Sequence, residues 1–349
     1  MITREEIVEI LKGIVHPETG VDIVSGGVLQ EVGIAEDGKI HLTMVFRRKR
    51  DPFAKSLAMR AKLAIEAAAE GADVEILIRE GEETPKPRQH EGMKSVRNIL
   101  AVASGKGGVG KSTVTANLAV ELQRLGYKVG VLDADIYGPS QPKLFGVEGH
   151  ELWAESVDGL DYIMPAESHG VKINSIGFFV DPATALVWRG PMATNALKQL
   201  INQTLWGELD FLLIDMPPGT GDVQISIAEN LSLSGALIVS TPQRVATADV
   251  LRGIKMFQQE GIEVPVLGIV ENMAYFSPAE LPENKYYIFG RGGARELAEQ
   301  EGLDFLGEIP LIQSIAENSD NGTPVALGSS EEEAHYAEIC RKIVSKLTK

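Results

Sequence analysis

The segment Gly105-Lys106-Gly107-Gly108-Val109-Gly110-Lys111-Ser112-Thr113 decides the fold of this chain. It follows the apolar run 99–103 and precedes a helical pattern that places Leu118, Leu122 and Leu125 on one face. The spacing satisfies G-x-x-x-x-G-K-[ST], in which small residues let backbone N–H groups point at phosphate oxygens at the positive end of a helix. The sequence therefore predicts a strand, a phosphate-binding loop and a helix. A merely flexible glycine turn is the alternative that this context disfavours.

The residues of this loop have expected roles in nucleotide binding. Lys111 is expected to reach the β- and γ-phosphates, and Ser112 to ligate magnesium. The loop residues expected to bind the nucleotide are Gly105, Lys106, Gly107, Gly108, Val109, Gly110, Lys111, Ser112 and Thr113.

Length and composition indicate a globular protein outside the membrane. A chain of 349 residues predicts one large domain and a smaller one. No run of about eighteen apolar residues is present, and residues 1–6 read as the start of a helix, so we expect a cytoplasmic protein without a membrane partner. The formal net charge of −16 disfavours nucleic acid as a partner, and the basic run 47–50 is read as a solvated loop rather than a docking patch.

The first eighty residues have the pattern of a small α+β domain. Thr3 and Glu6 predict a capping box for a helix to about Ile14. The elements expected after it are a hairpin over 28–34 and 39–46 with a turn at 37–38, a helix over 51–70 that begins with proline, and a strand over 73–78. The order α-β-β-α-β defines a predicted domain over residues 1–80.

A linker and a larger α/β domain follow. Residues 81–95 are expected to form the linker, because the stretch 79–93 carries charges, two prolines and few apolar residues. Over 96–349, short apolar runs alternate with helical patterns. The runs 129–132, 211–214, 236–239 and 266–270 are too continuously apolar for half-exposed strands. They predict a mostly parallel, twisted sheet with helices on both faces.

Polar residues stand where these strands end, and we expect them to face one crevice with the phosphate loop. Asp215 has the context of a Walker B aspartate that holds magnesium. Asp135 is the candidate for positioning the attacking water, and Asp133 is expected in the magnesium shell. For all three aspartates, capping of a neighbouring turn or helix remains an alternative. The segments 240–243 and 271–273 are expected to face the same crevice.

Two further features concern the state and the base of the nucleotide. The glycine-rich stretch 217–222 is a candidate switch that senses the γ-phosphate, with an ordinary tight loop as the alternative. No N-K-x-D or T-K-x-D follows a late strand, so the guanine-selecting arrangement is missing and adenine is favoured. Asn272 and the segment around Pro310 are the expected base contacts. The expected ligands are therefore ATP and Mg²⁺.

The second lysine of the loop, Lys106, resembles the deviant Walker A loop. This loop is shared by ATPases of chromosome partitioning (ParA), septum positioning (MinD), the nitrogenase iron protein and the Mrp/ApbC group. The resemblance implies an ATP-sandwiched homodimer in which Lys106 reaches the partner's nucleotide. A cation at that point would stabilise charge that develops in phosphoryl transfer, so Lys106 joins Lys111 and Asp135 as a candidate catalytic residue.

Within this class the chain is most similar to the Mrp/ApbC family of iron–sulfur cluster carrier ATPases. The resemblance covers 95–349 and runs through the segments 98–113, 133–140, 188–192, 215–222, 240–243, 271–273, 288–290 and 307–311. Residues 1–80 resemble a PaaD/SufT-type domain, on the strength of 16–20 and the order of elements. The resemblance implies an ATPase that acts in the assembly of iron–sulfur clusters or their transfer to apo-proteins, with apo-targets or assembly factors as partners.

The cysteines of that family are missing here. Many members carry C-x-x-C shortly after the Glu-Asn-Met strand, where this chain has Phe276-Ser277-Pro278-Ala279-Glu280-Leu281-Pro282. The first domain has 47–52 where relatives often place a cysteine before the proline. The one cysteine, Cys340, excludes an intrachain disulfide and lies on the apolar stripe of a terminal helix, which predicts a core role. The six histidines lack ligand spacing, so an iron–sulfur cluster is implied by resemblance while its ligands are not evident.

Two alternative functions remain at this stage. A positioning switch of the ParA/MinD type would need a basic face or a membrane-binding terminal helix, and the helix expected over 331–349 has an apolar stripe. An ATP-using carboxylase or amide ligase could line a substrate pocket with 153–179, but that segment shows no nucleophile with its base.

Overall fold

The structure, a computed structural model, divides into two compact units, residues 1–86 and 87–349. It describes residues 2–17, 20–35, 38–46, 53–69, 72–80, 91–157, 160–179, 190–278, 280–281, 283–328 and 331–347. The basic run 47–50, the predicted turn residue Asp37, Pro52 and the core of the predicted linker, 81–90, lie outside the described residues, as do 188 and 189 of the resemblance.

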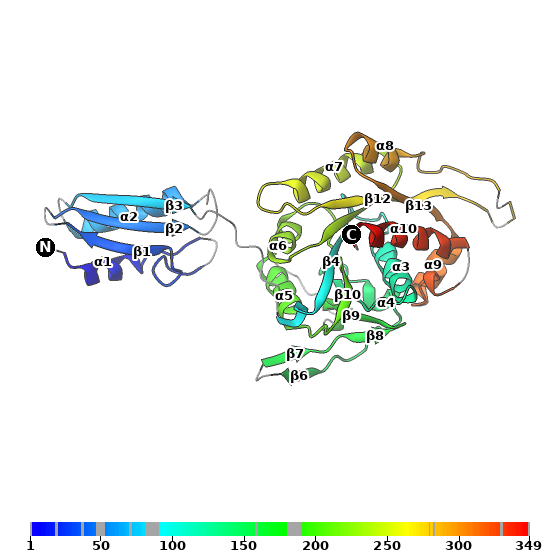
Figure 1. Cartoon of the computed structure of the whole chain (residues 1–349), viewed down its shortest axis with the longest axis horizontal. Helices are drawn as coiled ribbons and strands as arrows, with labels where there is room; N and C mark the ends of the chain where they lie inside the picture. The colour runs from blue at the N-terminus through cyan, green and yellow to red at the C-terminus, as the bar shows by residue number, and fades with distance from the viewer. Residues whose placement is uncertain are drawn as a thin grey trace. The chain divides into compact units, whose positions relative to one another are not determined.

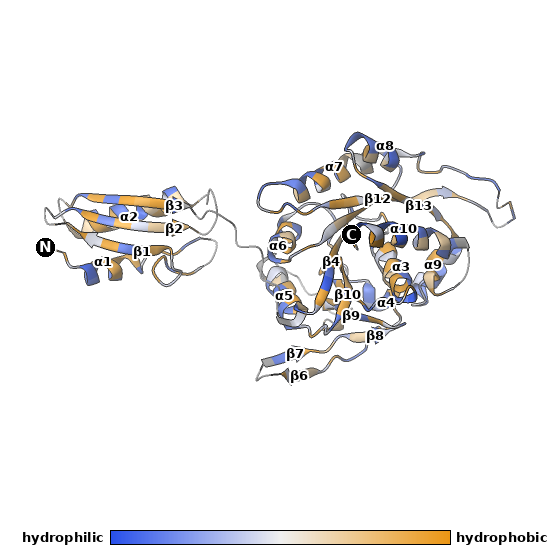
Figure 2. Cartoon of the chain, in the orientation of Figure 1, coloured by the Kyte–Doolittle hydropathy of each residue, from blue (hydrophilic) through white to orange (hydrophobic). Residues whose placement is uncertain are grey.

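The first unit packs two helices on one face of a three-stranded sheet (Figure 1). Its elements are α1 (Arg4–Leu11), β1 (Leu29–Ile34), β2 (Ile40–Phe46), α2 (Ala54–Ala68) and β3 (Val74–Glu80). The capping box of Thr3 and Glu6 is confirmed, although α1 ends at Leu11, three residues earlier than predicted. The predicted hairpin is confirmed as antiparallel β1 and β2, and β3 pairs with β2 in parallel. In Figure 2, hydrophobic residues run along β2 and β3.

The second unit is built on an eight-stranded sheet in the order β13-β12-β11-β4-β10-β5-β9-β8. Neighbouring strands pair in parallel except β8 with β9, so the mostly parallel α/β fold is confirmed. The strands are β4 (Val96–Ala103), β5 (Val129–Asp133), β8 (Ala166–Ser168), β9 (Val171–Ser175), β10 (Leu209–Asp215), β11 (Gly235–Ser240), β12 (Val266–Phe276) and β13 (Phe305–Leu311).

Helices cover both faces of this sheet, which explains the continuously apolar strands (Figure 1). In β4, Ile99 and Ala101 belong to the core on one face, while Leu100 and Val102 belong to the core on the other. The first core includes side chains of α5 (Gly190–Gln203), α6 (Asp222–Asn230), α7 (Arg244–Gln258) and α8 (Gly293–Gln300). The second includes side chains of α3 (Lys111–Arg124), α4 (Gln141–Leu144) and α10 (Glu331–Leu347).

The remaining elements lie at the margins of the sheet. A two-stranded antiparallel ribbon, β6 (Ala154–Val157) and β7 (Leu160–Ile163), precedes β8 and β9. These short strands occupy the segment 153–179, for which the sequence predicted only a possible pocket lining. The other elements are α9 (Gln313–Asp320) and the 3-10 turns Glu91–Met93, Ile176–Phe178 and Val325–Leu327.

The terminal helix α10 is a packing helix. Its apolar stripe, which includes Tyr336, Ile339, Cys340 and Ile343, is fully buried in the core that it shares with α3. The Cys340 thiol lies 3.6 Å from the carbonyl oxygen of Leu118, which confirms the predicted core role of this cysteine. Within the described ranges, no helix is both long and apolar enough to span a bilayer.

Candidate functional site: the phosphate loop and its acidic wall

The phosphate loop joins β4, in the middle of the sheet, to the N-terminus of α3. Gly108 and Gly110 both have a φ of 78°, in the left-handed region that favours glycine. A Cβ on Gly108 would meet no atom within 4 Å, so the surface of the loop is open at this point. Exposed backbone beside a helix N-terminus can donate N–H groups to an anion.

Close packing fixes the two ends of the loop. A Cβ on Gly105 would lie 2.3 Å from the backbone carbon of Asp249 in α7, and one on Gly110 would lie 2.3 Å from Asn272 Nδ2. The Asn272 amide donates to the carbonyl oxygen of Val109 over 2.8 Å. The loop is therefore held by Asn272 of β12 and by α7 at positions where a larger residue would force a neighbour to move.

Behind the loop, Lys111 forms a buried ion pair with Asp215, the last residue of β10. The Lys111 side chain is 5% exposed and that of Asp215 is 0% exposed. Asp215 also accepts hydrogen bonds from Thr115 Oγ1 (3.3 Å) and Gln141 Nε2 (2.7 Å). The lysine ammonium donates in addition to Ser112 Oγ (3.3 Å), so the residues predicted to hold phosphate and magnesium form one cluster.

Asp133, the last residue of β5, holds the turn that follows its strand. Its Oδ2 accepts from the backbone N–H groups of Ser140 and Gln141 and from Ser175 Oγ, each over 3.0 Å. Its Oδ1 accepts from the N–H of Asp135 over 3.1 Å. Burial, reinforced by the nearby Asp215 carboxylate, raises the pKa of Asp133 to about 7. Its predicted place in the magnesium shell stays a prediction.

Asp135, the candidate for positioning water, lies at the rim of this cluster and is half-buried. Burial raises the pKa of its carboxyl group, while Lys111 lowers it. Its backbone N–H is fixed by Asp133, so the turn delivers this side chain from the strand end next to Asp215. The catalytic role of Asp135 stays a prediction.

The candidate switch and the second lysine lie on the other side of the loop. Gln224 Nε2 donates to the carbonyl oxygens of Pro217 (3.1 Å) and Pro218 (2.6 Å), and the N–H of Gly219 donates to Ser104 O (3.0 Å). The half-buried Lys106 donates from Nζ to Gln243 Oε1 over 3.2 Å within its own chain. The bond from Gly219 to Ser104 ties the candidate switch to the residue that precedes the phosphate loop.

Glu271, which was expected to face the crevice, points to the N-terminus of α8 instead. The Glu271 carboxylate is buried and accepts a hydrogen bond of 2.7 Å from the N–H of Ala294, so it caps the N-terminus of α8. The prediction that Glu271 faces the phosphate loop is wrong, because α8 begins at glycines without a side-chain cap of its own. Its neighbour Asn272 does reach the loop, but through Val109, and its predicted contact with adenine stays a prediction.

The cluster fits a nucleotide with a divalent cation. Two buried carboxylates, Asp133 and Asp215, face a single buried ammonium, so negative charge is in excess. Three buried oxygen atoms in the same region, Ser140 Oγ, Gln141 Oε1 and Thr241 Oγ1, have no hydrogen-bond partner among the described residues. Mg²⁺ binds to oxygen ligands in a negatively charged site, and this cluster supplies both. The open loop can bind the phosphate anion through its backbone N–H groups.

The structure offers no comparable set for an iron–sulfur cluster. Among the described residues, no group of three or more His, Cys, Asp or Glu side chains could hold a metal ion. Burial raises the pKa of the Cys340 thiol well above its usual range, which opposes the thiolate that a cluster needs. The segment that replaces C-x-x-C closes on itself, because Phe276 and Tyr286 exchange backbone hydrogen bonds of 2.8 Å. We call the described residues 276–278, 280–281 and 283–286 the hairpin.

Sequence reasoning missed several residues that hold this site together. Thr115, Gln141, Ser175 and Gln224 all contact a predicted site residue or the candidate switch. Only Thr115 had a usable signal, since it lies one helical turn after Lys111 on the same face. The other three come from segments without a motif.

Comparisons with known proteins agree with this geometry. Residues 95–348 match the model of a family described as NUBPL iron-transfer P-loop NTPase, and residues 4–78 match a family described as iron-sulfur cluster assembly protein. An "Iron-sulfur cluster carrier protein" of Synechocystis is 37% identical over 353 residues, which cover 100% of this chain and 99% of the relative.

Solved structures show the same fold. A nucleotide-binding protein from Archaeoglobus fulgidus, in complex with ADP, is 40% identical, with a TM-score of 0.59 over 68% of this chain and 92% of that one. The cell division ATPase MinD of Pyrococcus furiosus is 23% identical, with a TM-score of 0.52 over 71% of this chain and 99% of that one, and shows the fold alone. The chain belongs to the family of NUBPL iron-transfer P-loop NTPases.

Proposed function

We propose that this family member hydrolyses ATP with Mg²⁺ and uses the nucleotide cycle to assist the assembly or transfer of iron–sulfur clusters to apo-proteins. The observation that carries the proposal is the buried cluster of Lys111, Asp215 and Asp133 directly behind the open loop. The relatives named as iron–sulfur cluster carriers support a cluster as the cargo. The Archaeoglobus relative, solved with ADP, supports an adenine nucleotide as the ligand.

The site residues have separate proposed roles. Loop N–H groups and Lys111 bind the phosphates, while Ser112 and Asp215 hold magnesium, which would compensate charge on the phosphates. Asp133 orders the turn that carries Asp135, and the Asp135 carboxylate orients the attacking water. Asn272, whose amide is bonded to the loop at Val109, is the proposed contact of the base.

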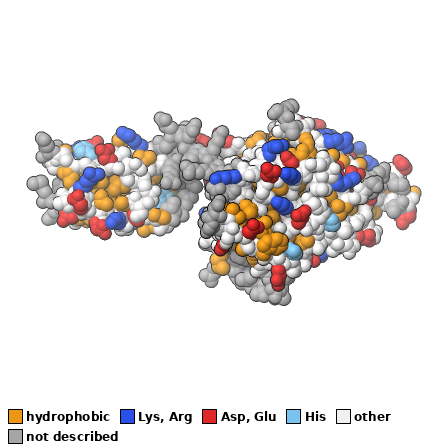
Figure 3. Space-filling view, turned by 60° about the horizontal axis from the view of Figure 1, so that its bottom comes forward, with side chains coloured by type: hydrophobic (Ala, Val, Ile, Leu, Met, Phe, Trp, Pro, Cys, Tyr) orange, Lys and Arg blue, Asp and Glu red, His pale blue; other side chains and the backbone are white. Residues whose placement is uncertain are grey.

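We also propose a cytoplasmic homodimer in which Lys106 acts across the interface. Its ammonium is held by only one contact described here, the neutral Gln243 amide, so moving it to a phosphate would break no described ion pair. We assign residues 1–80 to a separate PaaD/SufT-like domain. The linker predicted over 81–95 must end before Met93, which is buried in the core of the second unit. The positioning-switch alternative loses its expected membrane anchor, because the apolar stripe of α10 is buried. On the face drawn in Figure 3, acidic and basic side chains are interspersed rather than gathered into a basic surface.

The cargo must be held by thiolates other than those of this chain. Even a dimer would bring only two cysteines, both buried, while clusters are commonly held by four. The proposed role is therefore that of an accessory ATPase, which acts on a cluster ligated by an apo-protein or an assembly factor.

Anaerobic reconstitution with iron and sulfide tests this role. Iron and acid-labile sulfide are measured on the protein alone and after mixing with an apo-ferredoxin, with ATP or without it. We expect no stable cluster on the protein alone, and faster cluster formation on the apo-ferredoxin when ATP and Mg²⁺ are present. Cys340→Ala should behave like the native chain in this assay. A failure of ATP to change the rate with any apo-target would overturn the cluster-transfer role.

A further inference from the structure

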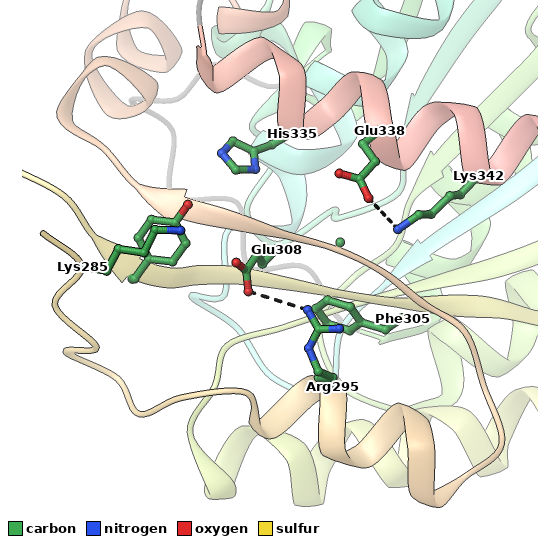
Figure 4. Close-up of a pocket in the computed structure, with 9 residues that line it drawn as sticks. Lys285, Arg295, Phe305, Glu308, His335, Glu338 and Lys342 are labelled. Atoms are coloured by element: carbon green, nitrogen blue, oxygen red, sulfur yellow. Dashed lines mark ion pairs between the residues drawn. The ribbon is translucent and has the colours of Figure 1, made fainter. Parts of the chain in front are cut away.

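A second pocket, of about 300 Å³, lies beside β13 at the edge of the sheet (Figure 4). β13 is separated from β4 and its phosphate loop by β12 and β11. Five parts of the chain line this pocket, namely β12, the hairpin, α8, β13 and α10. None of its lining residues belongs to the nucleotide site described above, so its chemistry is independent of that site.

Two cations in this pocket are supported by aromatic rings. Lys285 Nζ lies 3.9 Å from the centre of the Tyr275 ring, and the Arg295 guanidinium lies 3.9 Å from the centre of the Phe305 ring. A guanidinium over the face of a ring is attracted to that face and can still donate its N–H groups to an acceptor. The described carboxylate contact of Arg295, to Glu308, is long at 4.0 Å. Figure 4 shows Lys285 and Arg295 on either side of Glu308.

The other charged groups of the pocket are balanced or neutral. Lys342 Nζ donates to Glu338 Oε1 and to the carbonyl oxygen of Leu306, each over 2.8 Å, so this pair cancels. Burial lowers the pKa of His335, although hydrogen bonding to the Glu308 backbone opposes it, and the imidazole is neutral at pH 7. A hydrogen bond with Tyr275 raises the pKa of Lys285, which stays charged. Two cations thus face the single Glu308 carboxylate, which leaves one positive charge in excess.

We propose that this pocket binds a small organic acid that carries one carboxylate and one hydrogen-bond donor. The carboxylate lies between Lys285 and Arg295, where two N–H groups of the guanidinium suit its two oxygens. The donor, such as a hydroxyl group, faces Glu308, which can only accept when ionised. A phosphate dianion would leave the pocket negatively charged, so one carboxylate matches the charge better. The volume lies at the lower end of the range of small-molecule sites.

Nuclear magnetic resonance titration of the full chain tests the proposal with three probes at constant ionic strength. L-Lactate has the carboxylate and the hydroxyl, propionate lacks the hydroxyl, and inorganic phosphate carries more charge. We expect lactate to shift the backbone amides of Gly307 and Glu308, and to bind more tightly than propionate. Phosphate should shift the loop amides 107–111 instead, which separates the two sites.

Matched variants locate the binding groups. Arg295→Gln and Lys285→Gln should each weaken lactate binding about tenfold, as expected for a charge-assisted hydrogen bond. Arg291→Gln removes the same charge from a guanidinium that stacks on Tyr287 outside the pocket, and should leave binding unchanged. Glu308→Gln should reduce the preference for lactate over propionate. Equal losses in Arg291→Gln and Arg295→Gln, no shifts at 307–308, or tighter binding of phosphate at 307–308 would each overturn the proposal.

Discussion

The phosphate loop and the hairpin both follow strands of the same parallel sheet, yet they are stabilised in different ways. The loop follows β4 and is surrounded by buried charge, with Lys111 and Asp215 paired behind it. The hairpin follows β12 and is closed by its own backbone, with Lys285 stacked on Tyr275 beside it. Where relatives are expected to keep cluster-binding cysteines, this chain has a self-closed segment. The contrast teaches that buried charge stabilises the loop, whereas backbone pairing closes the segment that stands where the cysteines are expected.

Lys111→Ala tests the charged side of this comparison and should have the largest effect. The change removes the phosphate contact and leaves Asp215 buried without its cation, at a cost of about 3 kcal/mol or more. We expect ATP affinity to fall by about 100-fold or more, measured by titration calorimetry. Lys143→Ala, at an exposed lysine of α4, is the control and should bind ATP normally. Normal ATP binding by Lys111→Ala would contradict the assignment of the loop.

Lys106→Ala separates the two lysines of the loop. If Lys106 acts on the partner's nucleotide, ATP binding should stay within about twofold while turnover falls by about 1,000-fold, the lower end of the range for a cation supplied to phosphoryl transfer. Binding and phosphate release are measured on the same preparation. Equal loss of both would show that Lys106 serves the loop of its own chain.

Gly110→Ala and Gly108→Ala test how tightly the phosphate loop is packed. The two glycines make a matched pair, because both have a φ of 78°. Each alanine bears the left-handed strain of about 1 kcal/mol. Only the Cβ at residue 110 would collide with the Asn272 amide. We expect Gly110→Ala to lower the free energy of unfolding by about 2 kcal/mol more than Gly108→Ala, measured by urea denaturation. Equal losses would mean that Asn272 moves aside freely.

His335→Gln tests the pocket beside the hairpin and should have the smallest effect, a change in how the free energy of unfolding depends on pH. Because burial lowers its pKa in the folded chain, the unfolded chain binds the proton more readily below pH 6.5. The contribution of His335 to stability is therefore present above that pH and is lost as the pH falls. The charged groups that face it are Glu308, Lys285 and Glu338. His335→Gln should show a flatter loss of stability between pH 7.5 and 5.5, and an unchanged profile would rule out this linkage.

The sequence predicted those parts of the molecule whose physics is local. The loop at 105–113, the capping box of Thr3 and the buried strands depend on short patterns, and the structure shows all three elements. The short strands β6 and β7 were not predicted, because four-residue strands, of which β6 is largely exposed, lack the apolar runs of the central sheet. Gln141 and Ser175 were missed for another reason, since their contacts join segments that are distant in sequence.

The hairpin and Glu271 show the same limit. Missing cysteines could be read directly from the sequence, but the Phe276–Tyr286 bridge that takes their place could not, because it depends on backbone pairing rather than residue type. Glu271 was misassigned because a strand-end carboxylate and a distant helix cap have the same local pattern.

The buried ion pair of Lys111 and Asp215 also sets conditions for ligand entry. In the empty crevice, the Lys111 ammonium is already neutralised by the Asp215 carboxylate. An arriving phosphate group has to compete with a carboxylate for the same ammonium. Asp215 can release that ammonium at little electrostatic penalty only when a second cation arrives together with the phosphate. Nucleotide without metal should then compete poorly with Asp215 for the Lys111 ammonium. The site would therefore respond to the metal–nucleotide complex rather than to the metal or the nucleotide alone.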